Sequence, residues 1–226
     1  MPDALCILAK APQKVKVKTR LAAQIGEEKA LLLYRAMLSD TARAAALSQI
    51  PALWWIEGEA ETFGELLAGQ RVMRQPSGDL GDRIKAALRH SFGEGASRAA
   101  VIGADCPLMT HKHIKELFNP LKNSDISAIP SPDGGFCALG MAGFFGEIFE
   151  GVPWSSPDTL KVLLGNATNR ALRATLLEEL EDIDDLASLE RVAVKLNSGG
   201  DNASATRAAF FALKVARSGS PAPKNP

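Results

Sequence analysis

Asp105 ends the apolar stretch AAVIGAD, residues 99–105, and Pro107 turns the chain away two residues later. A carboxylate at the end of a buried strand lies at the edge of a sheet, where it can hold a hard cation such as Mg²⁺ or Mn²⁺ together with substrate phosphates. Asp is also common in turns, so a capping role is the alternative. These residues alone leave both roles open.

A second acidic group lies in LEDIDDLASLE, residues 180–190, and supplies Asp182, Asp184 and Asp185 just before an expected helix. Acidic residues stabilise the start of a helix in their own right, because its exposed N–H groups carry partial positive charge. The alternative is that this segment provides a second metal ligand.

Positive charge gathers in KAPQKVKVKTRL, residues 10–21, directly after the first expected strand. In an extended loop alternate residues share one side, so Lys14, Lys16, Lys18 and Arg20 would form a strip that could neutralise a di- or triphosphate. A solvated lysine-rich turn is the alternative. Basic and acidic residues balance at 26 each, so we expect no general attraction to nucleic acid or to an anionic membrane.

The segment PSPDGGFCALGM, residues 130–141, places Gly134 and Gly135 after Asp133. Glycine lacks a Cβ atom, so this backbone could approach a ligand closely. Asp-Gly-Gly is also an ordinary turn between two hairpin strands. The pattern alone is a weak indication of a ligand loop.

The segment QPSGDLGDRI, residues 75–84, turns at Gly78 and begins a helix with Gly81 in its first turn. A small residue there would let a base or sugar lie against the end of the helix.

The three cysteines, Cys6, Cys106 and Cys137, are widely spaced in apolar surroundings and form no C-x-x-C pair. This pattern argues against a disulfide framework and a structural zinc site, and it fits a reducing cytoplasm. Cys106 with His111 or His113 could be proposed as a nucleophilic pair, but a buried Cys before Pro is more often inert packing. We find neither a signal-peptide pattern nor a run long enough to span a bilayer.

These residues would be positioned by strands that alternate with helices. Such alternation predicts an α/β fold with a mostly parallel sheet. Strands are expected in the apolar or alternating segments 4–9, 51–58, 70–75, 99–105, 125–130 and 136–141. Helices are expected at 27–47, 63–67, 79–92, 110–118, 156–164 and 186–196, with Thr110 as an N-cap, and 171–177 is ambiguous.

We expect one domain over residues 1–196, since 226 residues suit a single large core. Residues 197–226 are expected to form a flexible link, a short helix and a disordered tail. The helix, with its phenylalanines and leucine, would either pack on the parent domain, which we favour, or dock a partner.

The order of these motifs resembles the rSAM/selenodomain-associated transferase 1 family: KAPxxxxVKTRL, QxxGDLGDR, GADCP, PxxDGGF, PWSSP at 153–157, then DIDD before a helix. The similarity runs from about Leu5 to Leu196. It implies a three-layer α/β/α Rossmann-like fold of the GT-A type, found in the nucleotide-diphospho-sugar transferase superfamily. It also implies a nucleotide or nucleotide-sugar ligand and a divalent cation, Mg²⁺ or Mn²⁺.

The resemblance also implies roles for individual residues. Asp105 and Asp184 would be the metal ligands, and Asp133 would lie in the loop near the sugar or acceptor. In glycosyl transfer, the Asp133 carboxylate is our candidate for the general base. The expected phosphate-binding and nucleotide-binding residues are Lys10, Lys18, Arg20, Gln75, Gly78 and Gly81. The expected sugar or acceptor loop includes Gly134, Gly135 and Trp154.

This chain departs from the family pattern at Lys14 and Val15, where Pro-Gly is usual, at Pro132, and at the Phe136–Cys137 pair. The phosphate loop and the acceptor pocket therefore differ from those of the family.

Three functions follow as hypotheses. The first is glycosyl transfer from a nucleotide-sugar to an acceptor. The second is nucleotidyl transfer, in which a nucleoside triphosphate joins a phosphorylated acceptor and releases pyrophosphate. The third is non-catalytic nucleotide binding or a scaffold role.

Overall fold

The computed structural model describes residues 2–13, 17–197 and 203–218. Its centre is a seven-stranded sheet with the order β3-β2-β1-β4-β6-β5-β7. The strands are β1 (Asp3–Lys10), β2 (Ala52–Glu57), β3 (Arg71–Arg74), β4 (Arg98–Gly103), β5 (Ile126–Pro130), β6 (Phe136–Met141) and β7 (Ala174–Leu176). Strand β6 runs antiparallel to both β4 and β5, and the other neighbours are parallel.

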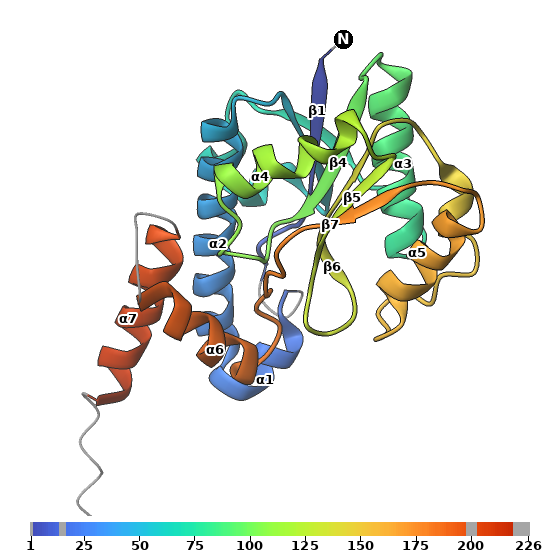
Figure 1. The fold of residues 1–226 in the computed structure, drawn as a ribbon. Helices are drawn as coiled ribbons and strands as arrows, with labels where there is room; N and C mark the ends of the chain where they lie inside the picture. Colours follow the sequence, from blue (N-terminus) through green and yellow to red (C-terminus); the bar gives the residue numbers. More distant parts are fainter. Residues whose placement is uncertain (1, 14–16, 198–202, 219–226) are drawn as a thin grey trace, which may run out of the picture.

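Helices cover both faces of this sheet (Figure 1). They are α1 (Thr19–Ile25), α2 (Glu27–Ser48), α3 (Leu80–Gly93), α4 (His111–Phe118), α5 (Thr159–Thr168), α6 (Leu186–Asn197) and α7 (Ser204–Ser218). Short 3₁₀ helices lie at Ala60–Leu67, Pro120–Lys122 and Gly146–Phe149. The expected three-layer α/β/α fold with a mostly parallel mixed sheet is confirmed.

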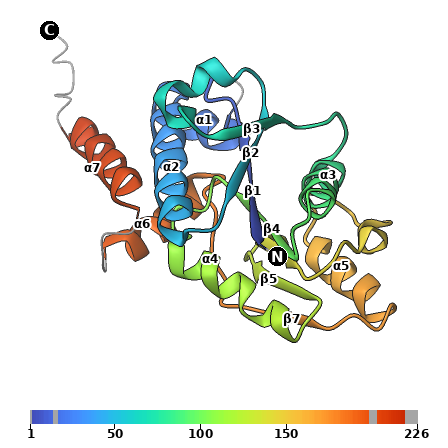
Figure 2. The ribbon, with the colours of Figure 1, turned by 90° about the horizontal axis from the view of Figure 1, so that it is seen from above.

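The two faces of the sheet carry separate hydrophobic cores because side chains alternate along each strand. In β1, Leu5 and Ile7 pack under α1, α2, α4, α6 and α7, whereas Cys6 packs under α3 and α5. Figure 2 shows α3 and α5 on one side of the sheet and α2, α6 and α7 on the other. Within the described residues, no helix combines the length and the apolar character needed to cross a bilayer.

Side chains define where the helices begin. Asp79 and Asp82 form a reciprocal capping box at the start of α3, and Thr110 and His113 form one at the start of α4. The expected N-cap at Thr110 is therefore confirmed. The helix expected at 156–164 begins later, at Thr159, and the ambiguous segment at 171–177 contains strand β7.

The C-terminal helix α7 packs on α2 (Figures 1 and 2). Its first turn is capped by a residue of α2: the backbone N–H of Ala205 donates to Asp40 Oδ1 at 3.1 Å, and that of Thr206 donates to Asp40 Oδ2 at 2.8 Å. Asp40 is buried. Most of the expected link, residues 198–202, and the expected tail, residues 219–226, lie outside the described residues.

Candidate functional site

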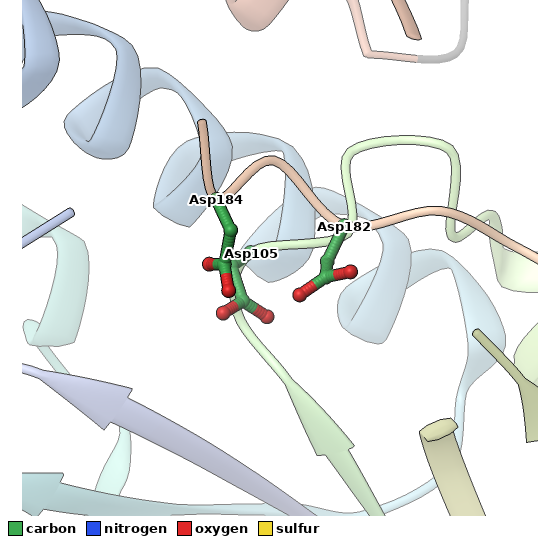
Figure 3. Close-up of side chains that lie close together, drawn as sticks. All are labelled: Asp105, Asp182 and Asp184. Carbon is green, nitrogen blue, oxygen red and sulfur yellow. The ribbon is translucent and has the colours of Figure 1, made fainter. Parts of the chain in front are cut away.

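Three carboxylates converge at the sheet edge where β4 ends. Asp105 follows β4, and Asp182 and Asp184 lie in the segment that leads into α6. One oxygen from each carboxylate lies within 4.8 Å of one from each of the others, and all three residues are half-buried. Figure 3 shows the three side chains gathered at one point. We call these residues the acidic triad.

Hydrogen bonds hold the two parts of the acidic triad together. The N–H of Ile183 donates to the carbonyl oxygen of Asp105 at 3.1 Å. At the start of α6, the N–H groups of Asp184 and Asp185 both donate to Ser188 Oγ at 3.0 Å, and Ser188 N–H donates to Asp185 Oδ1 at 2.8 Å. The start of α6 therefore positions Asp184, while Asp185 serves as its cap.

Lys18 reaches the acidic triad from the turn before α1. Its Nζ donates to Asp105 Oδ2 at 2.9 Å and to Asp184 Oδ1 at 2.6 Å, and only 7% of its side chain is exposed. Burial would lower the pKa of Lys18, but the two carboxylates outweigh burial and raise it. Burial would likewise raise the pKa of Asp105, but the Lys18 ammonium holds that pKa below its ordinary value.

The surroundings of Asp182 raise its pKa, whereas those of Asp105 lower the pKa of that residue. Burial, together with the negative charges of Asp105 and Asp184, raises its pKa to about 6. Ser131 Oγ donates to Asp182 Oδ1 at 3.3 Å and to Asp133 Oδ1 at 2.7 Å. Asp182 is therefore more easily protonated than Asp105.

The prediction that alternate cations share one side of an extended loop is wrong for Lys18 and Arg20. Lys18 adopts a left-handed conformation, with φ 47° and ψ 48°, and Thr19 begins helix α1, which the periodicity did not predict. A helix removes the two-residue alternation, so Lys18 points into the site while Arg20 is exposed on α1. Residues 14–16, which include Lys14, lie outside the described residues.

Lys10 lies at the end of β1 and is positioned through its backbone. The hydroxyl of Tyr34 donates to the Lys10 carbonyl oxygen at 2.9 Å and accepts from the Lys10 N–H at 2.9 Å. Its ammonium lies 3.6 Å from Glu57 Oε1 and is partly exposed.

Gln75, expected near a nucleobase, bridges the ends of two strands. Its Nε2 donates to the carbonyl oxygens of Ala9 at 3.1 Å and Trp55 at 2.8 Å. Beside it, Arg83 Nη1 donates to Glu57 Oε2 at 2.6 Å. A line of polar groups therefore follows the carboxyl ends of β1, β2 and β3, next to the acidic triad at β4.

Gly81 does not leave open space for a base, because the indole ring of Trp154 fills the place where a Cβ atom would stand. Trp154 stacks on Phe149 with a centroid distance of 6.0 Å and meets the edge of Phe136 at 6.4 Å. Gly78 has a φ of 124°, and a Cβ atom there would overlap Asp82. Both glycines thus have packing roles, and their contact with a nucleotide stays a prediction.

The Asp133 loop is a tight turn between β5 and β6. Gly135 N–H donates to Asp133 Oδ1 at 2.9 Å, and Gly134 adopts a φ of 86° against Pro157. Asp133 is exposed, and its Oδ1 already accepts two hydrogen bonds. The residue therefore shapes the turn, and its role as a base stays a prediction.

Sequence comparison assigns the chain to a family. A profile described as "Uncharacterized protein conserved in bacteria (DUF2064)" matches residues 37–156, more than half of the chain. The chain belongs to this family. No curated protein matches the sequence.

Solved structures resemble this DUF2064 protein over most of its length. A Desulfovibrio desulfuricans G20 protein, provisionally described as a nucleotide-diphospho-sugar transferase, shares 24% identity with a TM-score of 0.87, covering 95% of this chain and 96% of that one. A nucleotidyl transferase from Methanothermobacter thermautotrophicus shares 14% identity with a TM-score of 0.61, covering 88% and 99%. Rv0371c from Mycobacterium tuberculosis H37Rv, in complex with manganese, shares 14% identity with a TM-score of 0.53, covering 88% and 100%. These likenesses confirm the GT-A-like fold.

Two features of the site in this DUF2064 protein escaped the sequence analysis. Asp182 was named in the segment that could provide a second metal ligand, but only Asp184 was chosen as that ligand. Asp182 nevertheless completes the triad, and its two-residue spacing from Asp184 could have indicated a shared side. The pairing of Lys18 with Asp105 and Asp184 had no sequence signal, because the partners lie far apart along the chain.

The donor set of the acidic triad fits a hard divalent cation. All three groups are carboxylates, and oxygen ligands are those that Mg²⁺ and Mn²⁺ prefer. Asp105 and Asp184, the two predicted ligands, are both members of the triad.

Proposed function

We propose that this protein is a metal-dependent transferase with a nucleotide-sugar donor, similar to glycosyltransferases. The observation that carries the proposal is the acidic triad with Lys18 at the carboxyl edge of the sheet. In open α/β sheets, ligands bind at this edge. The likeness to the Desulfovibrio protein and the motif order of the rSAM/selenodomain-associated transferase 1 family support the same chemistry.

In this proposal Asp105 and Asp184, with Asp182 beside them, hold Mg²⁺ or Mn²⁺. The cation, when bound, would offset the charge that develops on the leaving nucleoside diphosphate. Lys18, Lys10 and Arg20 contribute positive charge toward the phosphates.

The remaining predicted residues belong to two groups, which meet where Gly81 packs against Trp154. Gln75, Gly78 and Gly81, in the segment that leads from β3 into α3, would contact the nucleobase. Gly134, Gly135 and Trp154 lie on the β6 side and would bound the sugar and the acceptor, with Asp133 as the candidate base. The protein would act on small molecules in the cytoplasm, where its three free cysteines stay reduced.

Nucleotidyl transfer is the second candidate function. The likeness to the Methanothermobacter nucleotidyl transferase favours it, since that protein has the same fold. Release of pyrophosphate from a nucleoside triphosphate would distinguish this reaction from glycosyl transfer.

Calorimetry tests the proposal with a panel of nucleoside diphosphates, triphosphates and nucleotide-sugars, each with and without Mn²⁺. We expect Mn²⁺-dependent binding of at least one nucleotide, weakened at least about tenfold by Asp105→Asn. Asp158→Asn changes an exposed carboxylate on the surface and is the matched control. Failure of the whole panel to bind to folded wild-type protein would reject the nucleotide-sugar hypothesis and favour a scaffold role.

A further inference from the structure

Lys18 occupies carboxylate oxygens that a metal ion would need. Its ammonium donates hydrogen bonds to Asp105 Oδ2 at 2.9 Å and to Asp184 Oδ1 at 2.6 Å. These two residues are the proposed metal ligands, and together with Asp182 they offer their oxygens within one 4.8 Å cluster. The buried ammonium therefore offsets part of the triad's negative charge within the protein itself.

Neighbouring buried residues hold the backbone of Lys18 in place, and displacement of its ammonium would require only rotation about the bonds of its side chain. Val17 before it and Leu21 after it are both buried, which anchors the turn into α1. The lysine stem has four rotatable carbons, so the ammonium can leave the carboxylates without movement of the backbone.

A divalent cation and the Lys18 ammonium would compete for the same carboxylate oxygens of Asp105 and Asp184. A metal ion bound at about 2.0–2.6 Å from a carboxylate oxygen would stand close to an ammonium that keeps its hydrogen bond to that group. Two positive charges at such a separation repel each other, and the burial of the Lys18 side chain weakens the screening of this repulsion by solvent.

We propose that Lys18 is an internal cation that offsets part of the negative charge of the acidic triad until a divalent cation displaces it and so releases its ammonium toward the phosphates of the ligand. This inference rests on the proposed function, in which Asp105 and Asp184 bind the metal. It makes metal and nucleotide binding mutually supportive, because each favours the state in which Lys18 has left the carboxylates. It also means that, in the absence of nucleotide, the triad binds a metal ion less tightly than it would without the competing Lys18 ammonium.

The first test measures Mn²⁺ affinity by calorimetry without nucleotide. Lys18→Gln removes the competing ammonium and keeps a polar side chain, so we expect Mn²⁺ to bind about tenfold more tightly than in wild type. Lys161→Gln makes the same change at a lysine of α5 whose side chain is 84% exposed and is the matched control, with a change of less than about twofold expected.

The outcomes separate the two proposals. Mn²⁺ affinity in Lys18→Gln equal to or weaker than in wild type, with binding still lost in Asp105→Asn, would overturn the role of Lys18 and leave the metal site standing. No Mn²⁺ binding in wild type or in Lys18→Gln would overturn the metal site itself.

The second test uses only the wild-type protein and does not depend on the folding of a variant. Acetylation of lysine amines by a reactive ester is followed residue by residue by mass spectrometry, in EDTA and in saturating Mg²⁺. We expect Lys18 to be protected in EDTA and labelled at least about fivefold faster with Mg²⁺. Lys161, whose side chain is 84% exposed, serves as the internal control. Protection of Lys18 that does not change with Mg²⁺ would overturn the displacement.

Discussion

Gly134 shows how a single residue shapes the turn between β5 and β6. Its φ of 86° favours glycine, and a Cβ atom there would overlap the Pro157 backbone. We expect Gly134→Ala to lower the free energy of unfolding by about 2–3 kcal/mol, measured by urea denaturation. Gly165, in open space within α5, is the control, and Gly165→Ala should stabilise the protein by about 0.5–1 kcal/mol. Equal effects of both variants would contradict this account of the turn.

Asp182 makes the stability of the metal-free protein depend on pH. Its pKa is raised from 3.8 to about 6, so the folded state binds a proton more tightly than the unfolded chain does. The carboxyl of Asp182 therefore contributes fully to the free energy of unfolding at a pH below its pKa in the unfolded chain, 3.8. This contribution is lost as the pH rises through its pKa in the folded protein, about 6.

Asp182→Asn tests this linkage, because asparagine stays neutral. In EDTA, we expect the variant to gain stability over wild type between about pH 4.5 and about pH 7, by about 2 kcal/mol. Urea denaturation at several pH values measures the difference. A difference that does not change with pH would show that the carboxyl titrates normally.

At the scale of elements, α7 is joined to the domain by a buried side chain of α2. Asp40 accepts hydrogen bonds from the Ala205 and Thr206 backbones and from the Thr206 hydroxyl. We expect Asp40→Ala to cost about 1–2 kcal/mol and to speed amide hydrogen exchange in the first turns of α7. The neighbouring Ser39→Ala, at an exposed position, should do neither. Unchanged exchange in α7 would show that the apolar contacts alone hold this helix.

At the scale of the whole molecule, one sheet joins the two cores. Cys6 lies in the core under α3 and α5, whereas Cys106 and Cys137 lie in the core under α2 and α4, and all three thiols are buried. Because β1 and β4 supply side chains to both faces, we expect the cores to unfold together. Thiol labelling followed by mass spectrometry across a urea series should give one midpoint for all three cysteines. Earlier labelling of Cys6 would indicate that the two faces unfold separately.

Local patterns in the sequence determined the elements and the order of the motifs. Apolar runs predicted β1 and β4, and the spacing of leucines and alanines predicted α2, because alternation and helical periodicity depend on near neighbours alone. They also placed Asp105 at the end of a strand and Asp184 just before a helix. Among the helices and strands that the structure describes, α1 was missed because its seven residues are too few to show a period, and β7 was left ambiguous. Two short 3₁₀ helices, at Pro120–Lys122 and Gly146–Phe149, were also missed.

The tertiary structure decided which of these residues meet. Asp182 lies beside Asp105 although 77 positions of sequence separate them. Lys18 lies between Asp105 and Asp184, because the carboxyl ends of β1 and β4 are adjacent only in the folded sheet. Trp154 likewise filled the space beside Gly81, which the sequence had left open for a ligand. Contacts of this kind depend on strand order and helix packing, and no local pattern records them.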